Sequence, residues 1–145
     1  EIRLSLVGSE MCIRDRRKTC ALVRNTSPEI ATVGITADEA KAQGRAVITG
    51  KYVMSGNGKS IIENEDRGFI KLVFDAETEK LIGAQLMCGR ATDMIGEMVT
   101  AVSAGLTKAQ LAMALHPHPT FCEGITEAVH AADGHSIHIM PPRRR

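Results

Sequence analysis

Two histidines near the carboxyl end carry the side chains best suited to proton transfer. The stretch HPHPTFCE holds His116 and His118 one residue apart and places Glu123 a few residues later. Pro119 disfavours helical backbone at His118, so we expect this imidazole to project from a stiff, extended segment just before a helix. Glu123, in the first turn of that helix, could then turn back toward the His118 ring.

The chemistry that such a pair can perform is general acid–base catalysis. A carboxylate beside an imidazole fixes which ring nitrogen carries the proton and stabilises the protonated ring. The free pKa of histidine is about 6.5 and that of a thiol about 8.5, so a histidine with a raised pKa is suited to accept a thiol proton. A positioned base typically contributes about 10²- to 10⁴-fold in rate. His118 and Glu123 are therefore the predicted catalytic pair.

Two other interpretations of this stretch remain open from the residues alone. Glu123 could serve only to cap its helix, with His118 an ordinary residue of a surface loop. His116, His118 and Cys122 could instead bind a metal ion, but the ligand count is short and no second cluster supplies the rest. We predict no metal site.

The elements that must position this stretch follow a regular pattern from Lys18 onward. Short runs rich in β-branched and apolar residues predict strands at residues 20–24, 29–34, 45–54, 68–75 and 81–89. The polar link DAETEK between the last two runs is too short for a crossover, so we expect them to pair as antiparallel neighbours. The stretch SGNGKS is predicted to be a loop.

Helices are predicted between and after these strands. Capping boxes at residues 36–39, 107–110 and 120–123 begin three of them, at residues 37–43 for the first and from Phe121 for the last. A further helix is indicated by apolar residues at helical spacing that end at a glycine, namely Met94, Ile95, Met98, Val99, Val102 and Gly105. Strands followed by helices indicate an α+β fold in which helices cover an antiparallel β-sheet.

Composition argues against several functional classes. The 145 residues carry a formal net charge of +1 and only 3% aromatic residues, so neither a basic surface nor a stacking platform for nucleic acid is indicated. No apolar run approaches the length of a membrane span. The four cysteines form no CxxC pair, so we expect reduced thiols and a cytoplasmic protein.

The two ends of the chain differ from the part between them. SLVGSEMCIRDR, residues 5–16, resembles the translation of a transposon-type sequencing adapter, so residues 1–17 are predicted to be a non-native leader. A native disordered leader is the alternative. Residues 18–135 form the predicted domain, and residues 136–145 a solvated C-terminal tail.

From about Thr19 to its end the chain resembles a known family. H-x-H-P-T-x-x-E is similar to the signature of dihydrolipoamide dehydrogenases, within the flavin-dependent pyridine nucleotide–disulfide oxidoreductases. SPEIATVGIT resembles the opening of that family's interface domain, and residues 68–97 its central hairpin and following helix. The resemblance implies that residues 18–135 are the C-terminal dimerisation domain, with the fold of FAD/NAD-linked reductases.

The resemblance also implies a role for each residue of HPHPTFCE. His118 acts as the acid–base group toward a dihydrolipoamide thiol at the partner subunit's disulfide and FAD, and Glu123 orients it. The backbone of His118 and Pro119 lies near the partner's flavin, and His116 lines the substrate approach. The implied cofactors are FAD and NAD. The implied partners are a second copy of the chain and the lipoyl domain of a 2-oxoacid dehydrogenase complex.

The chain departs from that family in two features. It has no GxGxxG turn after a strand and no C-x-x-x-x-C redox pair. We therefore expect a fragment that is inactive alone and holds half of a composite site. The alternatives are the interface domain of another disulfide reductase of the family and a dimerisation module without catalysis.

Overall fold

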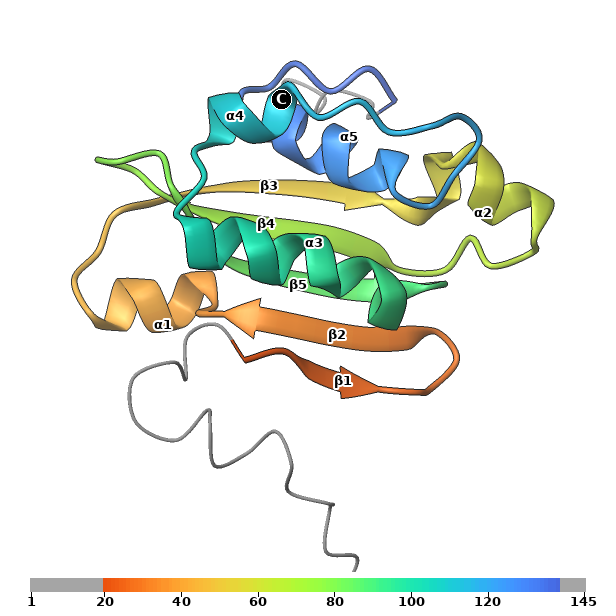
Figure 1. Cartoon of the computed structure of the whole chain (residues 1–145), viewed down its shortest axis with the longest axis horizontal. Coiled ribbons are helices and arrows are strands. Elements are labelled where there is room, and N and C mark those ends of the chain that lie inside the picture. Colours follow the sequence, from red (N-terminus) through yellow and green to blue (C-terminus); the bar gives the residue numbers. More distant parts are fainter. Residues whose placement is uncertain (1–19, 139–145) are drawn as a thin grey trace, which may run out of the picture.

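A single antiparallel sheet organises the described part of the chain, residues 20–138 of a computed structural model (Figure 1). Its strands are β1 (Leu22–Arg24), β2 (Glu29–Gly34), β3 (Val47–Val53), β4 (Phe69–Asp75) and β5 (Leu81–Cys88). Every pairing is antiparallel, and the order across the sheet is β1-β2-β5-β4-β3. The predicted antiparallel sheet is confirmed, and β5 is its central strand.

Helices cover one face of this sheet. α3 (Ala91–Ala104) packs on β2 and β5, while α5 (Glu123–Ala131) packs on β3 and β4 (Figure 1). The shorter elements are α1 (Ala37–Ala42), the 3-10 turn η1 (Met54–Gly56), α2 (Gly58–Ile62) and α4 (Lys108–Ala112). No helix within residues 20–138 is long and apolar enough to cross a membrane. The helices over the sheet confirm the predicted α+β class.

The core fills the space between the sheet and these helices. Leu72 and Phe74 of β4 are completely buried, as is Met98 of α3. Gly50 of β3 lets α5 approach closely, because a Cβ there would lie 1.8 Å from the backbone oxygen of Ala128. α5, which begins with a predicted site residue, is thereby held directly against the sheet.

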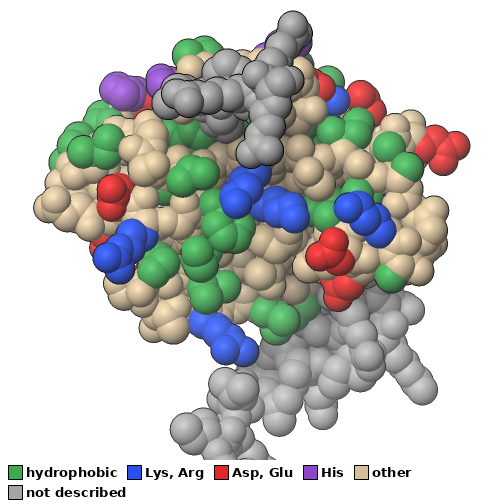
Figure 2. Space-filling model, turned by 180° about the vertical axis from the view of Figure 1, so that it is seen from behind, with side chains coloured by type: hydrophobic (Ala, Val, Ile, Leu, Met, Phe, Trp, Pro, Cys, Tyr) green, Lys and Arg blue, Asp and Glu red, His purple; other side chains and the backbone are tan. Residues whose placement is uncertain are grey.

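The opposite face of the sheet carries a mixed surface. Figure 2 shows hydrophobic side chains interspersed with lysines and arginines on this side of the molecule. A lysine and an aromatic ring are in contact here: the Nζ atom of Lys51 lies 4.6 Å from the centre of the Phe69 ring. The cation lies over the ring, an arrangement that the negative face of an aromatic ring favours.

Most predicted elements agree with the structure to within two residues at each end. The capping boxes that begin α1 and α4 are confirmed, with Thr36 and Thr107 accepting from backbone N–H groups three residues on. The loop prediction for SGNGKS was wrong, because the Asn57 side chain caps α2 by accepting from the Ser60 amide. Asparagine is a favoured N-cap residue, so Asn57 is the signal for this helix in the sequence.

The third predicted capping box was also wrong in its details. α5 begins at Glu123, not at Phe121, and its N-cap Cys122 makes no side-chain capping bond. The Thr120 hydroxyl donates to the Pro117 carbonyl at 2.7 Å, so it does not serve the helix. Only the Glu123 half of the box is present, with its carboxylate accepting from the Thr120 amide at 2.9 Å.

The chain ends lie mostly outside the described residues. These exclude the whole predicted leader, residues 1–17, and residues 139–145 of the predicted tail. The described start of the tail is bound to α5, where the carboxylate of Glu127 accepts hydrogen bonds from the Ser136 hydroxyl, the Ile137 amide and the His138 amide. The His138 ring contacts the same carboxylate, with Nδ1 2.9 Å from Oε1.

Candidate functional site

His118 and Glu123 are in direct contact. The Nδ1 atom of His118 lies 2.8 Å from the Oε1 atom of Glu123. An ionised carboxylate only accepts hydrogen bonds, so Nδ1 carries a proton and the lone pair of the neutral ring is at Nε2. The His118 side chain is 78% exposed, and Nε2 has no hydrogen-bond partner among residues 20–138. The geometry therefore leaves this nitrogen free to take up a proton from outside the domain.

The carboxylate of Glu123 is held by two sets of contacts. Its Oε2 atom accepts from the Thr120 amide while Oε1 faces the His118 ring. Burial acts to raise the pKa of the Glu123 carboxyl, but the hydrogen bonds from Thr120 and His118 and the Coulombic interaction with His118 and His116 outweigh it and lower this pKa below its usual value. Glu123 therefore stays ionised beside the His118 ring near neutral pH.

The segment between α4 and α5, which carries His118, is non-helical. Hydrogen bonds fix the end of this segment that leads into α5, its far end. In Figure 1 the chain leaves α4, runs toward α2 and turns back into α5. The His118–Pro119 peptide bond is cis. The carbonyl of Thr120 accepts a hydrogen bond of 3.0 Å from the side-chain amide of Asn57. A residue at the start of α2 thus fixes the point where the segment enters α5.

His116 has different partners from His118, although the two are predicted in one motif. Its Nδ1 atom lies 2.7 Å from the Thr126 hydroxyl, and its Nε2 atom lies 3.1 Å from the carboxylate of Glu97. The His116 side chain is only 11% exposed. Neither partner was identified in the sequence, because each lies ten or more residues away and no local pattern marks it.

One pocket of about 390 Å³ joins these groups. His116, His118 and Glu123 line it together with Tyr52 and Glu127. Burial, followed by the charges of Glu127 and Glu123, raises the pKa of Tyr52 to about 12, so its phenol stays protonated. The pocket therefore combines a fixed carboxylate, an open imidazole nitrogen and a neutral hydroxyl.

Cys88 and Cys122 do not add a reactive thiol to this site. Within residues 20–138, no group of three or more His, Cys, Asp or Glu side chains could hold a metal ion. Cys88 and Cys122 are free thiols. The pKa of Cys88 is raised to about 12, mainly by burial. Burial also raises the pKa of Cys122. Because the thiolate is the reactive form, neither cysteine is activated as a nucleophile.

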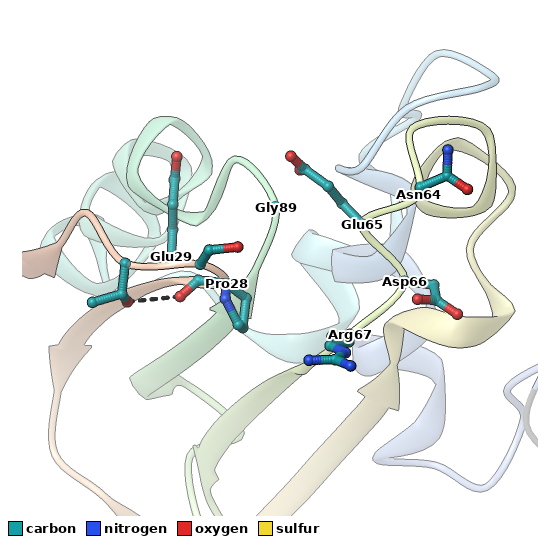
Figure 3. Close-up of a pocket in the computed structure, with 9 residues that line it drawn as sticks. Pro28, Glu29, Asn64, Glu65, Asp66, Arg67 and Gly89 are labelled. Carbon is teal, nitrogen blue, oxygen red and sulfur yellow. Dashed lines mark hydrogen bonds between the residues drawn. The ribbon is translucent and has the colours of Figure 1, made fainter.

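A second pocket, of about 200 Å³, contains none of the predicted site residues. Figure 3 shows Glu29 and Glu65 on opposite sides of its opening, with Arg67 at its base. The Glu29 carboxylate is already used, since it accepts from the amide and hydroxyl of Thr92 at 2.9 and 2.7 Å. Its role is to join β2 to the first turn of α3.

Comparison with protein families gives a match over most of the domain. Residues 20–129 match the family described as the pyridine nucleotide-disulphide oxidoreductase dimerisation domain. The match includes every strand of the sheet and both residues of the His118–Glu123 pair.

Individual relatives agree with this match. A dihydrolipoyl dehydrogenase of Bacillus subtilis is 42% identical over 114 residues, which are 79% of this chain and 24% of that protein. One from Halobacterium salinarum is 34% identical over 140 residues, 97% of this chain and 29% of that protein. The crystal structure of LpdA from Mycobacterium tuberculosis superposes with a TM-score of 0.75 and 28% identity, covering 80% of this chain and 25% of LpdA. The chain therefore spans about a quarter of the length of these relatives.

Proposed function

We propose a function from the premise that this chain belongs to the pyridine nucleotide-disulphide oxidoreductases, as an example of their dimerisation domain. The proposed activity is that of a longer protein containing this domain, an NAD-dependent dihydrolipoamide dehydrogenase. In that protein the domain supplies His118 and Glu123 as an acid–base pair. The observation that carries the proposal is the 2.8 Å contact between these side chains, which orients the ring and leaves Nε2 open.

The proposed step is a proton transfer coupled to thiol–disulfide exchange. Nε2 of His118 takes the proton from one thiol of dihydrolipoamide as its sulfur attacks a disulfide. One sulfur–sulfur bond forms, one breaks, and the leaving sulfur departs as a thiolate. The carboxylate of Glu123 keeps Nδ1 protonated throughout and offsets the positive charge that forms on the ring.

The described residues fit one side of a flavin site. His118 and Pro119 are exposed, so the main chain of this bend can lie against a flat ring system. The chain has no GxGxxG turn to hold phosphates, so the rest of an FAD site and the NAD site must come from other domains. A bound flavin supplies the two-electron chemistry that the chain's own side chains lack.

The site is proposed to be composite. The disulfide and flavin face His118 from a partner subunit in a homodimer built through this domain. Support comes from the family, whose domain is described as a dimerisation domain, and from the exposure of His118 at 78%. The proposed source of dihydrolipoamide is the lipoyl domain of a 2-oxoacid dehydrogenase complex.

The proposal is tested with His118→Gln in the full-length flavoprotein. Loss of the base should lower kcat for NAD-linked dihydrolipoamide oxidation by about 10²- to 10⁴-fold, because glutamine cannot accept the proton. Turnover would be measured at matched flavin content. His130→Gln is a suitable control, since His130 lies on α5 and makes no side-chain hydrogen bond within the described residues. Normal turnover in His118→Gln would refute the base.

The lipoamide assignment needs a separate measurement. The unmodified full-length protein would be assayed with dihydrolipoamide and with other low-molecular-weight dithiols and disulfides. We expect the highest kcat/KM for dihydrolipoamide. A clear preference for a different disulfide would reject the substrate while leaving the proposed base intact.

A further inference from the structure

The ring of His116 is held at both nitrogens. Nε2 faces the carboxylate of Glu97 at 3.1 and 3.2 Å, and Nδ1 lies 2.7 Å from the hydroxyl of Thr126. Because the carboxylate only accepts, Nε2 carries a proton, and the Thr126 hydroxyl can donate to Nδ1 or accept from it. Both contacts therefore survive in either protonation state of the ring. Neither nitrogen of His116 is open to a group from outside the domain.

This ring joins the segment to two helices. Glu97 lies on α3, which covers β2 and β5, and Thr126 lies on α5, which covers β3 and β4. Thr126 is three residues after Glu123, so the two side chains lie on the same face of α5, one turn apart. His116 and His118 are two residues apart in the segment and contact Thr126 and Glu123 respectively. The two histidines thus contact the same face of α5, His118 at its first residue and His116 one turn later.

Packing does not hold this part of the segment. Leu115 is 96% exposed, and Pro117 on the other side of His116 is also exposed. The hydrogen bonds of Thr120 secure only the far end of the segment. Nearer to α4, the side chain of His116, which is only 11% exposed, joins the segment to α3 and α5.

We infer that His116 is a positioning residue for the proposed reaction: its contacts with Glu97 and Thr126 hold the segment so that His118 reaches Glu123 with Nε2 directed outward. The inference rests on the proposed function of His118. It assigns to Glu97 and Thr126 a role in the same reaction, through His116. A misplacement of about 1 Å in such an arrangement can cost about 100-fold in rate, so these contacts bear directly on turnover.

The test is a double-mutant cycle in the full-length flavoprotein. His116→Gln alone should lower kcat about 10- to 100-fold with little change in KM, because both ring nitrogens of His116 are already bonded within the domain. In the His118→Gln background the same change should lower kcat by less than twofold, since the group it positions is gone. Equal losses in both backgrounds, or normal turnover in His116→Gln alone, would overturn the inference.

A second pair of variants separates positioning from folding. If His116→Gln reduces flavin content or thermal stability, Thr126→Val and Thr126→Ser decide the question. Valine removes the hydroxyl at similar size and should lower kcat about tenfold, whereas serine keeps the hydroxyl and should retain nearly normal kcat. Equal kcat in the two variants would contradict the inference. Native turnover in His118→Gln would instead contradict the proposed function itself, whatever the Thr126 variants show.

Discussion

His116 and His118 have the same side chain but different surroundings in this domain. His116 is 11% exposed with both ring nitrogens bonded, and His118 is 78% exposed with one nitrogen open. The difference comes from their partners. Glu97 and Thr126 bond both nitrogens of the His116 ring, whereas Glu123 bonds only Nδ1 of His118. Proton exchange requires an accessible nitrogen. Only His118 has one, so His118 is the proposed base and His116 holds the segment in place.

The carboxylate of Glu123 can be tested with a side chain of nearly the same shape. In Glu123→Gln, the single remaining oxygen can accept from His118 or from the Thr120 amide, but not from both, because the NH2 group in place of the other oxygen only donates. A hydrogen bond to a charged group is worth about 1.5–3 kcal/mol and a neutral one about 0.5–1.5 kcal/mol, a difference that corresponds to about tenfold in rate. We expect kcat of the full-length enzyme to fall about tenfold. Glu65→Gln provides the control, and an unchanged kcat in Glu123→Gln would show that the carboxylate is not needed.

At the scale of elements, α5 connects the proposed site to the end of the described chain. Its first residue, Glu123, faces His118, and Glu127 one turn later binds residues 136–138. Burial acts to raise the pKa of the Glu127 carboxyl, but the hydrogen bonds from Ser136 and His138 outweigh it, so the net pKa is lowered. The helix thus holds the tail through one ionised carboxylate.

This attachment should depend on pH. The folded-state pKa of Glu127 is below its ordinary value of 4.5, so its stabilising contribution is complete above that pH and is lost as the pH falls through the folded-state pKa. Amide protection of Ile137 and His138, measured by hydrogen exchange and corrected for intrinsic rates, should therefore decrease in acid. In Glu127→Gln the protection should be lower near neutral pH and should lack this acid dependence. The same acid dependence in the variant would assign it to another group.

Local signals in the sequence predicted several elements well, for physical reasons. The capping boxes of α1 and α4 and the glycine after α3 act within a few residues, so their meaning does not depend on the rest of the fold. The contact between His118 and Glu123 was predictable for the same reason, since one short stretch contains both residues. The capping box failed at Thr120 because its hydroxyl donates to the Pro117 carbonyl, while Asn57 from a distant part of the chain holds the Thr120 carbonyl.

Long-range contacts were beyond sequence reasoning. Glu97 and Thr126 reach His116 only after α3 and α5 have packed on neighbouring strands of the sheet. The strand order was equally hidden, because β2 pairs with β5 across two intervening helices and two strands. Such pairings depend on complementary surfaces that no single segment displays.

At the scale of the whole molecule, exposed apolar side chains lie close to the proposed site. Met113 is 81% exposed and Leu115 is 96% exposed, immediately before His116 in the chain. Exposed apolar patches mark protein–protein contacts, and the family of this domain is described as a dimerisation domain. Association through this surface would bring the segment of His118 next to another subunit.

This surface gives a prediction for the assembly. Leu115→Glu in the full-length protein should raise the dimer dissociation constant at least about tenfold, because an unpaired charge is costly to bury at an interface. Turnover should decrease as dimer is lost, since the proposed site needs two subunits. Sedimentation velocity over a dilution series would measure the dissociation constant, with Leu115→Met as a control that keeps the apolar area. A native dissociation constant in Leu115→Glu would place the interface elsewhere.

The pairing of β2 with β5 has a consequence for synthesis on the ribosome. β2 ends at Gly34 and pairs with β1 on one side, but its neighbour on the other side, β5, begins only at Leu81. At about 5–20 residues per second, several seconds pass before the second strand is made. During that interval the edge of β2 that pairs with β5 has no partner strand, and α3, which packs on β2, has not yet been made. A nascent chain of this domain therefore has an unpaired strand edge, and it can close its sheet only after most of the domain has emerged.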